Sequence, residues 1–130
     1  AWIKNIFHIP CSDLIYTENK QLNIYNKVMA GCSNPDLSED FLYMHDDIFL
    51  LCPQPFNYLH WGTMKADAAT NQSYNRTLCN TVSLFPGTNN FDGHTPIIYN
   101  KEKFKQIPAP KMEYGFCIKT VYCNTNKIEG

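Results

Sequence analysis

The sequence lacks the features that mark several large classes of protein. Among its 130 residues, no apolar run approaches the ~20 residues that a membrane-spanning helix needs. Neither sign of charge is in clear excess, with 11 basic and 12 acidic residues and a net charge of −1. The sequence therefore offers no field of one sign to attract nucleic acid or an anionic membrane surface. We expect neither nucleic acid as a partner nor a membrane span.

Glycine-rich phosphate loops, serine-nucleophile motifs and zinc-type cysteine pairs are also missing. The six cysteines show no C-x-x-C spacing, and most lie in apolar stretches, where reduced cysteine behaves as a small apolar side chain. A single domain over residues 1–130 is large enough to fold without disulfides. With no signal peptide, this predicts reduced thiols and a cytoplasmic setting. Two N-glycosylation patterns, at Asn71 and Asn75, are short enough to arise by chance.

Strand-like and helical segments alternate along the chain, which predicts the α/β class. Apolar runs predict strands at residues 2–10, 41–44 and 48–51, and residues 97–99 form a further short apolar piece. The run at 41–44 has no polar alternation, which is typical of a strand covered on both faces. Capping residues predict helices that begin at Thr17, Ser73 and Asn100 and end near Ala30, Phe85 and Ile107. Residues 114–123 fit a strand or a helix equally well.

Two helices have an apolar stripe at spacings of three and four residues. The stripe of the first consists of Leu22, Tyr25, Val28, Met29 and Cys32. The stripe of the second consists of Tyr74, Leu78, Val82 and Phe85. Gly31 suits the left-handed position after the first helix. The alternating Lys101, Lys103 and Lys105 predict a solvated helix face.

Asp46 and Asp47 are the most informative residues for function. Two adjacent carboxylates between apolar strand-like runs are costly to bury unless a cation compensates their charge. Mg²⁺ and Mn²⁺ prefer carboxylate oxygen and commonly keep phosphate and water as further ligands. In open α/β sheets, a strand at 41–44 would bring the pair to the ligand-binding edge. The alternative is a tight hairpin turn, where aspartate is also common.

The segment 91–96 is the second candidate for chemistry. Gly93 permits a tight turn and Pro96 restrains Thr95 to extended geometry, so that His94 is displayed at the end of a loop. A neutral imidazole there would serve as a general base toward a substrate hydroxyl or as a metal ligand. Asp92 would orient that imidazole or cap the turn. The alternative for His94 is an ordinary exposed loop histidine.

An irregular segment at residues 56–70 carries several aromatic side chains. Tyr58, His60 and Trp61 are candidates for a platform on which an acceptor sugar stacks. The competing interpretation is an aromatic loop that packs on the core.

Taken in order, residues 2–6, 37–49 and 93–98 resemble the Stealth family. This family includes bacterial capsular polysaccharide phosphotransferases and related phage and bacterial glycosyltransferase-like proteins. Its members carry an acidic segment of the form F-h-Y-x-N-D-D and a later H-x-P segment. Asp46 and Asp47 match the acidic pair, and His94 with Pro96 matches the later segment, whereas His45 stands where the family usually has asparagine.

The resemblance implies a partial GT-A-like α/β fold, a mixed sheet with flanking helices as in nucleotide-diphospho-sugar transferases. It implies Mg²⁺ or Mn²⁺ at Asp46 and Asp47, and His94 near the acceptor hydroxyl. The family's first segment, which binds the nucleotide end of the donor, would lie before Ala1. The chain would thus be the metal and acceptor half of a catalytic domain. The donor half would lie outside it or come from another chain, and a homo-oligomer is the alternative assembly.

Three functional hypotheses follow. The first is metal-dependent transfer of a sugar-phosphate or glycosyl group from a nucleotide-sugar to a saccharide hydroxyl, with His94 and Asp92 as catalytic residues. The second is a non-catalytic carbohydrate-binding or assembly module on the same scaffold. The third is a small metal-dependent hydrolase that uses the same acids.

Overall fold

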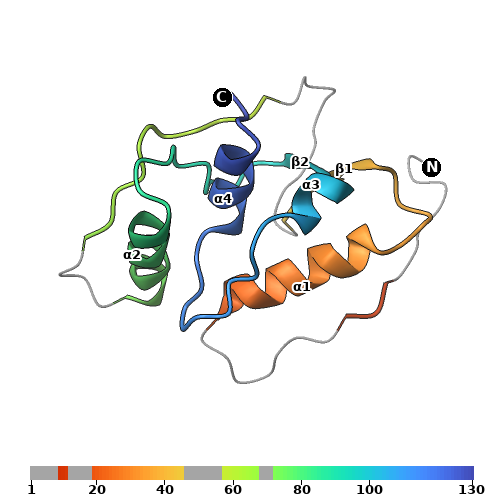
Figure 1. Cartoon of the computed structure of the whole chain (residues 1–130), viewed down its shortest axis with the longest axis horizontal. Coiled ribbons are helices and arrows are strands. Elements are labelled where there is room, and N and C mark those ends of the chain that lie inside the picture. Colours follow the sequence, from red (N-terminus) through yellow and green to blue (C-terminus); the bar gives the residue numbers. More distant parts are fainter. Residues whose placement is uncertain (1–8, 12–18, 46–56, 68–71) are drawn as a thin grey trace.

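The computed structural model describes residues 9–11, 19–45, 57–67 and 72–130 (Figure 1). Helices and short strands alternate along this part of the chain. In order they are α1 (Lys20–Cys32), β1 (Asp40–Tyr43), α2 (Ser73–Leu84), β2 (Ile97–Asn100), α3 (Lys101–Lys105) and α4 (Ile118–Thr125). The described part therefore confirms a mixed α and β fold. The predicted strands at 2–10 and 48–51 lie wholly or mainly outside it.

β1 and β2 pair antiparallel, with Asp40 opposite Asn100 and Tyr43 opposite Ile97. In the described residues the sheet consists of these two strands. The predicted strand at 41–44 is thus confirmed, but its expected burial on both faces is wrong. Leu42 is 36% exposed, because alternate side chains of β1 point away from the core.

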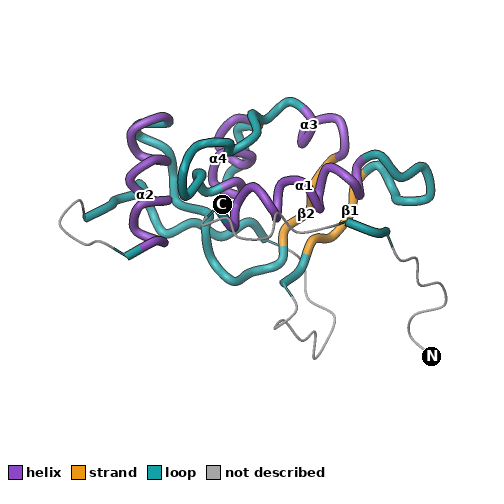
Figure 2. The backbone as a smooth tube through the Cα atoms, turned by 90° about the horizontal axis from the view of Figure 1, so that it is seen from below, coloured by secondary structure: helices purple, strands orange, loops and turns teal. Residues whose placement is uncertain are grey.

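The core gathers around aromatic rings of β2, α3 and α4. The ring of Tyr99 lies 4.8 Å from that of Phe104 and 4.7 Å from that of Tyr122, both edge-on. Figures 1 and 2 both place α4 between α2 and the two strands. Its residues 118–123 are all buried, so the ambiguous tail is a helix surrounded by other elements. The buried positions of α4 include the polar residues Lys119 and Thr120, so its burial does not follow an apolar stripe and the sequence left both readings open.

α1 carries the predicted apolar face, with Val28 and Cys32 buried against the core. Its first capping residue is Asn19, whereas the predicted Thr17 lies outside the described residues. The left-handed position expected at Gly31 is wrong. The helix continues to Cys32, and its backbone ends in the right-handed conformation at Ser33.

Ser73, the predicted capping residue of α2, is instead its first helical residue. The capping residue is Gln72, which makes no side-chain capping bond. The predicted apolar stripe is confirmed only in part. Phe85 packs on the core, and Leu78 and Val82 are half-buried. Tyr74, however, is 51% exposed, whereas Thr77 and Thr81 are buried. The two threonines are tolerated inside because their hydroxyls donate to the carbonyls of Tyr114 (2.7 Å) and Thr77 (2.7 Å).

α3 is capped by Asn100 as predicted, because the Asn100 side chain accepts a bond from the amide of Lys103. The helix ends at Lys105, two residues before the predicted end. Lys103 is exposed as expected, but Lys101 is only 8% exposed and its Nζ donates to the carbonyl of Asn34 at 2.7 Å.

Two further predictions concern the surface. Asn75, in the second glycosylation pattern, is buried and its amide donates to the carbonyl of Asp67, so the folded chain does not present it for modification. Of the helices in the described residues, none combines the length and the apolar character needed to cross a membrane.

Candidate functional site

Two predicted segments meet where β1 ends and β2 begins. The antiparallel register sets Tyr43 opposite Ile97, so the residues after β1 approach those before β2. The imidazoles of His45 and His94 stack there, with centroids 5.0 Å apart and planes inclined by 9°. Tyr43 contacts the His45 ring edge-on at 5.5 Å. The sequence reasoning treated His45 only as a neighbour of the acidic pair and missed this contact.

Asp46 and Asp47 lie outside the described residues. Asp46 directly follows His45 in the sequence, so this described segment ends at one of the two stacked histidines. Within the described residues, no group of three or more His, Cys, Asp or Glu side chains is placed to hold a metal ion.

His94 is exposed at the tip of a tightly folded loop. The amide of Gly93 donates to the carbonyl of Phe91 at 2.9 Å, and the amide of Thr95 donates to that of Gly93 at 2.8 Å. The tight turn expected at Gly93 is confirmed, although this residue does not adopt a left-handed conformation. Its hydrogen side chain instead leaves room for Trp61, whose Nε1 would lie 3.0 Å from an added Cβ.

Lys119 of α4 holds the same loop from inside. Its Nζ donates to the carbonyl of Gly93 (2.8 Å), the carbonyl of Thr95 (2.6 Å) and the hydroxyl of Thr95 (2.9 Å). Burial lowers the pKa of this ammonium, and the negative charge of Asp92 acts in the opposite direction. Sequence reasoning missed Lys119; the only available signal was a single lysine inside the apolar run 116–123.

Asp92 accepts two bonds on one carboxylate oxygen. The hydroxyl of Tyr74 donates to Oδ2 at 2.7 Å, and the thiol of Cys117 donates to it at 3.4 Å. Burial, followed by the bond to Asp92, raises the pKa of Tyr74; burial and the charge of Asp92 raise that of Cys117. Both groups therefore remain neutral donors, and Cys117 lacks the thiolate character of a nucleophile. The bonds described here tie Asp92 to α2 and to the start of α4.

A small pocket opens beside these groups. Its walls mix charged, polar and aromatic side chains from α1, both strands, the loop and α4. They are Gln21, Ile24, Tyr43, His45, Asp92, Tyr99, Ile118 and Lys119.

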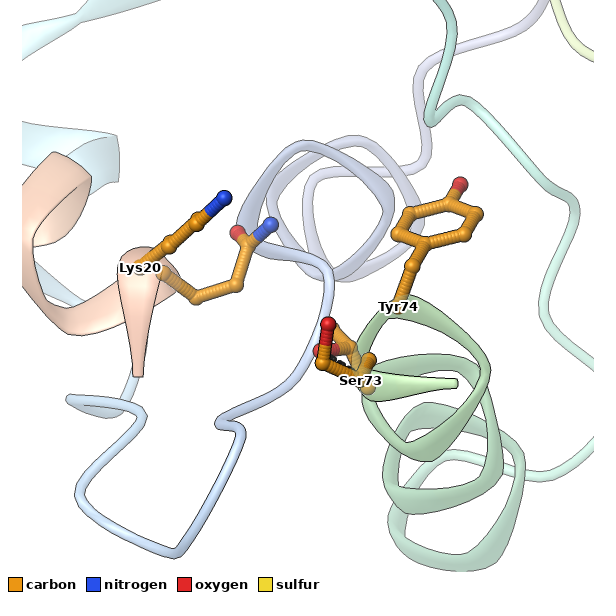
Figure 3. A pocket seen from close by; sticks show the side chains of 5 residues that line it. Lys20, Ser73 and Tyr74 are labelled. Carbon is orange, nitrogen blue, oxygen red and sulfur yellow. Dashed lines mark hydrogen bonds between the residues drawn. The ribbon is translucent and has the colours of Figure 1, made fainter. Parts of the chain in front are cut away.

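A second pocket lies between the first turns of α1 and α2 (Figure 3). Lys20 and Gln21 line it from α1, and Ser73, Tyr74 and Thr77 line it from α2. Gln21 lines both pockets, and the Tyr74 hydroxyl reaches from the second toward Asp92 of the first. The two pockets are therefore neighbours along the start of α1.

The three predicted acceptor residues have different surroundings. The Tyr58 hydroxyl donates to the carbonyl of Ile98 at 3.0 Å and its ring packs against the core. The His60 ring lies 5.3 Å from that of Phe91, and its Nδ1 accepts the amide of Gly62. Trp61, by contrast, is 68% exposed. The first two fit the packed-loop interpretation, and Trp61 alone presents a free aromatic face.

Trp61 is held next to His94 by backbone pairing. The amide of Trp61 donates to the carbonyl of Asn90 at 2.8 Å, and the amide of Asn90 donates to Gly62 at 2.7 Å. The indole thus lies against Gly93, one residue before His94.

His94, His45, Trp61 and the pocket wall form one surface region, hereafter the His94 site. Comparison with protein-family models, curated proteins and solved structures finds no match to this chain.

Proposed function

We propose that this chain takes part in metal-dependent transfer of a sugar-phosphate or glycosyl group from a nucleotide-sugar to a saccharide hydroxyl. The observation that carries the proposal is the stacking of His45 on His94 at 5.0 Å. It brings the residue preceding the acidic pair against the histidine of the second predicted segment. The segment that leads into the predicted metal ligands therefore meets the segment that carries the predicted general base, which supports one common site.

In this proposal Asp46 and Asp47 hold Mg²⁺ or Mn²⁺, since paired carboxylates are ligands that these ions favour. When bound, the cation would offset the negative charge of the donor phosphates. The imidazole of His94 takes the proton from the acceptor hydroxyl, for which its exposure at the loop tip is suitable. The exposed indole of Trp61 offers the acceptor sugar a stacking surface next to that imidazole.

The proposal also extends to fold and setting. The chain belongs, in this view, to a Stealth-like, GT-A-type domain, and the nucleotide end of the donor is bound outside it or by another chain. The described cysteines are free thiols, which supports a reducing compartment such as the cytoplasm.

The metal claim is tested by Mn²⁺ titration of the wild type and of Asp47→Asn, followed by paramagnetic broadening of the His45 and His94 imidazole signals. We expect broadening in the wild type and a loss of affinity of about tenfold or more in the variant. Asp36→Asn is the matched control, because Asp36 is exposed in the turn after α1. Equal Mn²⁺ affinity in the wild type and Asp47→Asn would remove the central claim.

The role of His94 is tested by single-turnover transfer from a nucleotide-sugar to a saccharide panel. We expect His94→Ala to lower the rate by a factor of about 10²–10⁴, with partial rescue by added imidazole. Release of the donor sugar to water in place of transfer would support the hydrolase instead.

A non-catalytic carbohydrate-binding module is the second candidate, and the 68% exposure of Trp61 favours it. In that case a glycan screen would detect binding without turnover of nucleotide-sugars. Trp61→Ala would abolish the binding, whereas Leu59→Ala, a 52% exposed residue of the same loop, would leave it intact.

A further inference from the structure

Lys119 is unusual because a lysine is rarely buried unless its ammonium finds partners. Only 8% of Lys119 is exposed, and three acceptors surround its Nζ at 2.6–2.9 Å. An ammonium has three N–H donors, so the three bonds use all of them. Lys119 therefore retains no donor for a substrate, even though its side chain lines the pocket next to His45.

All three acceptors belong to the residues on either side of His94. Gly93 supplies one carbonyl, and Thr95 supplies its carbonyl and its hydroxyl. The ammonium thus fixes the backbone immediately before and immediately after the histidine. Bonds from one charged group to two carbonyls and a hydroxyl are stronger than ordinary neutral ones, particularly in a buried place.

The base of this connection is itself rigid. Lys119 lies in the buried stretch 118–123 of α4, whose first residues are tied to α2 and to α1. The amide of Cys117 donates to the hydroxyl of Thr81 at 2.9 Å, and the amide of Ile118 donates to Gln21 at 3.3 Å. Through Lys119, the backbone on both sides of His94 is therefore connected to the centre of the molecule.

We propose that Lys119 is a positioning residue of the His94 site, which sets where the imidazole of His94 lies by holding Gly93 and Thr95. The effect on transfer rests on the proposed function, whereas the effect on the loop does not. A displacement of about 1 Å in a reacting group is enough to reduce a rate by a large factor, so a loop tip needs such an anchor.

The test compares Lys119→Met with Lys101→Met. Methionine keeps an unbranched apolar side chain and removes the ammonium. Lys101 is the matched control because it is equally buried, at 8% exposure, and also donates to a backbone carbonyl, that of Asn34. Its carbonyl partner lies in the turn after α1 and not in the His94 loop.

The first readout is hydrogen exchange of the Thr95 amide together with the line width of the His94 imidazole signal. In Lys119→Met we expect Thr95 exchange to rise about tenfold or more and the imidazole signal to shift and broaden, because the loop opens more often. In Lys101→Met both should remain as in the wild type. Unchanged exchange in Lys119→Met, or an equal change in Lys101→Met, would overturn the proposal.

The second variant, Thr95→Val, guards against loss of folding in Lys119→Met. It keeps the shape of the side chain and removes one of the three acceptors. We expect a smaller rise in exchange at the same amides, and the absence of any rise would count against the proposal.

The third readout is the transfer reaction of the same variants. We expect Lys119→Met to lower kcat about tenfold with little change in KM, since the substrate loses no direct contact. A rise in KM at constant kcat would show that Lys119 binds substrate and would overturn its assignment as a positioning residue. If the wild type shows no transfer, the proposed function fails, and the exchange measurements still decide the positioning of the loop.

Discussion

At the scale of single residues, the molecule buries polar groups by giving each a defined partner. Among the described residues, no buried side-chain nitrogen or oxygen is without a hydrogen bond. Thr81 and Thr120 are both fully buried. The Thr120 hydroxyl accepts the amide of Phe91 at 3.1 Å, and that of Thr81 accepts the amide of Cys117. Each of these threonine hydroxyls thus satisfies a buried backbone amide. An apolar stripe does not predict such positions, because threonine is not counted as apolar.

Thr81→Val should therefore destabilise the protein by about 1–3 kcal/mol, because the buried amide of Cys117 loses its acceptor while the volume stays the same. The measurement is the free energy of unfolding in urea. Thr81→Ser keeps the hydroxyl and should cost less, and Thr125→Val on the exposed end of α4 should stay within experimental error. Equal stabilities for Thr81→Val and Thr125→Val would contradict this role.

At the scale of elements, the start of α1 depends on a contact between distant segments. Asn19 accepts the amide of Leu22 at 3.0 Å as a helix cap, and its amide donates to the carbonyls of Pro110 and Met112. Gly115 has a φ of +61°, and a side chain there would collide with Asn19. One asparagine thus joins α1 to the segment that leads into α4.

Asn19→Ala should cost about 2 kcal/mol, since it removes a helix cap and leaves two carbonyls without their donor. Asn26→Ala is the control within the same helix, and alanine there should be neutral or slightly stabilising. The comparison uses urea unfolding, together with far-ultraviolet circular dichroism for the helix content. A loss for Asn26→Ala as large as for Asn19→Ala would contradict the capping role.

At the scale of the whole molecule, the core holds thiols and phenols that resist ionisation. Burial raises the pKa of Cys123 from its ordinary value of 9.0 to about 12, and it raises that of Tyr99 well above its ordinary value. The folded state therefore keeps protons that the unfolded chain releases, so these groups contribute full stability below about pH 9. Lys119 acts in the opposite sense. Its pKa is lowered by burial, so the free-energy cost of burying its charge disappears as the pH rises and the ammonium loses its proton.

We expect the thiols and phenols to outweigh this single lysine, and the urea midpoint to fall steadily between about pH 9 and about pH 12. Cys123→Ala should show a smaller fall than the wild type over the same range, measured in the presence of a reductant. An equal or steeper fall in Cys123→Ala would show that burial of this thiol does not set the alkaline limit.

The sequence anticipated much of the local structure and part of the site. The strand at 41–44 and the helices that begin near residues 19, 73 and 101 follow from spacings and caps within a few residues. Its errors share a cause. The burial of Thr77 in place of Tyr74 on α2 and the exposure of Leu42 on β1 each depend on what packs against that residue. Thr77 meets the carbonyl of Tyr114, whereas Leu42 lies on the open face of the sheet.

By itself, the sequence determined which chemical groups are present and much of the local backbone. These are an acidic pair after an apolar run, a histidine displayed before Pro96, and helices before, between and after them. Tertiary structure decided which of these groups meet. The stacking of His45 on His94 arises from the antiparallel register of two four-residue strands. Lys119 reaches acceptors 26 and 24 residues away, because burying an ammonium requires carbonyls that only the folded chain supplies.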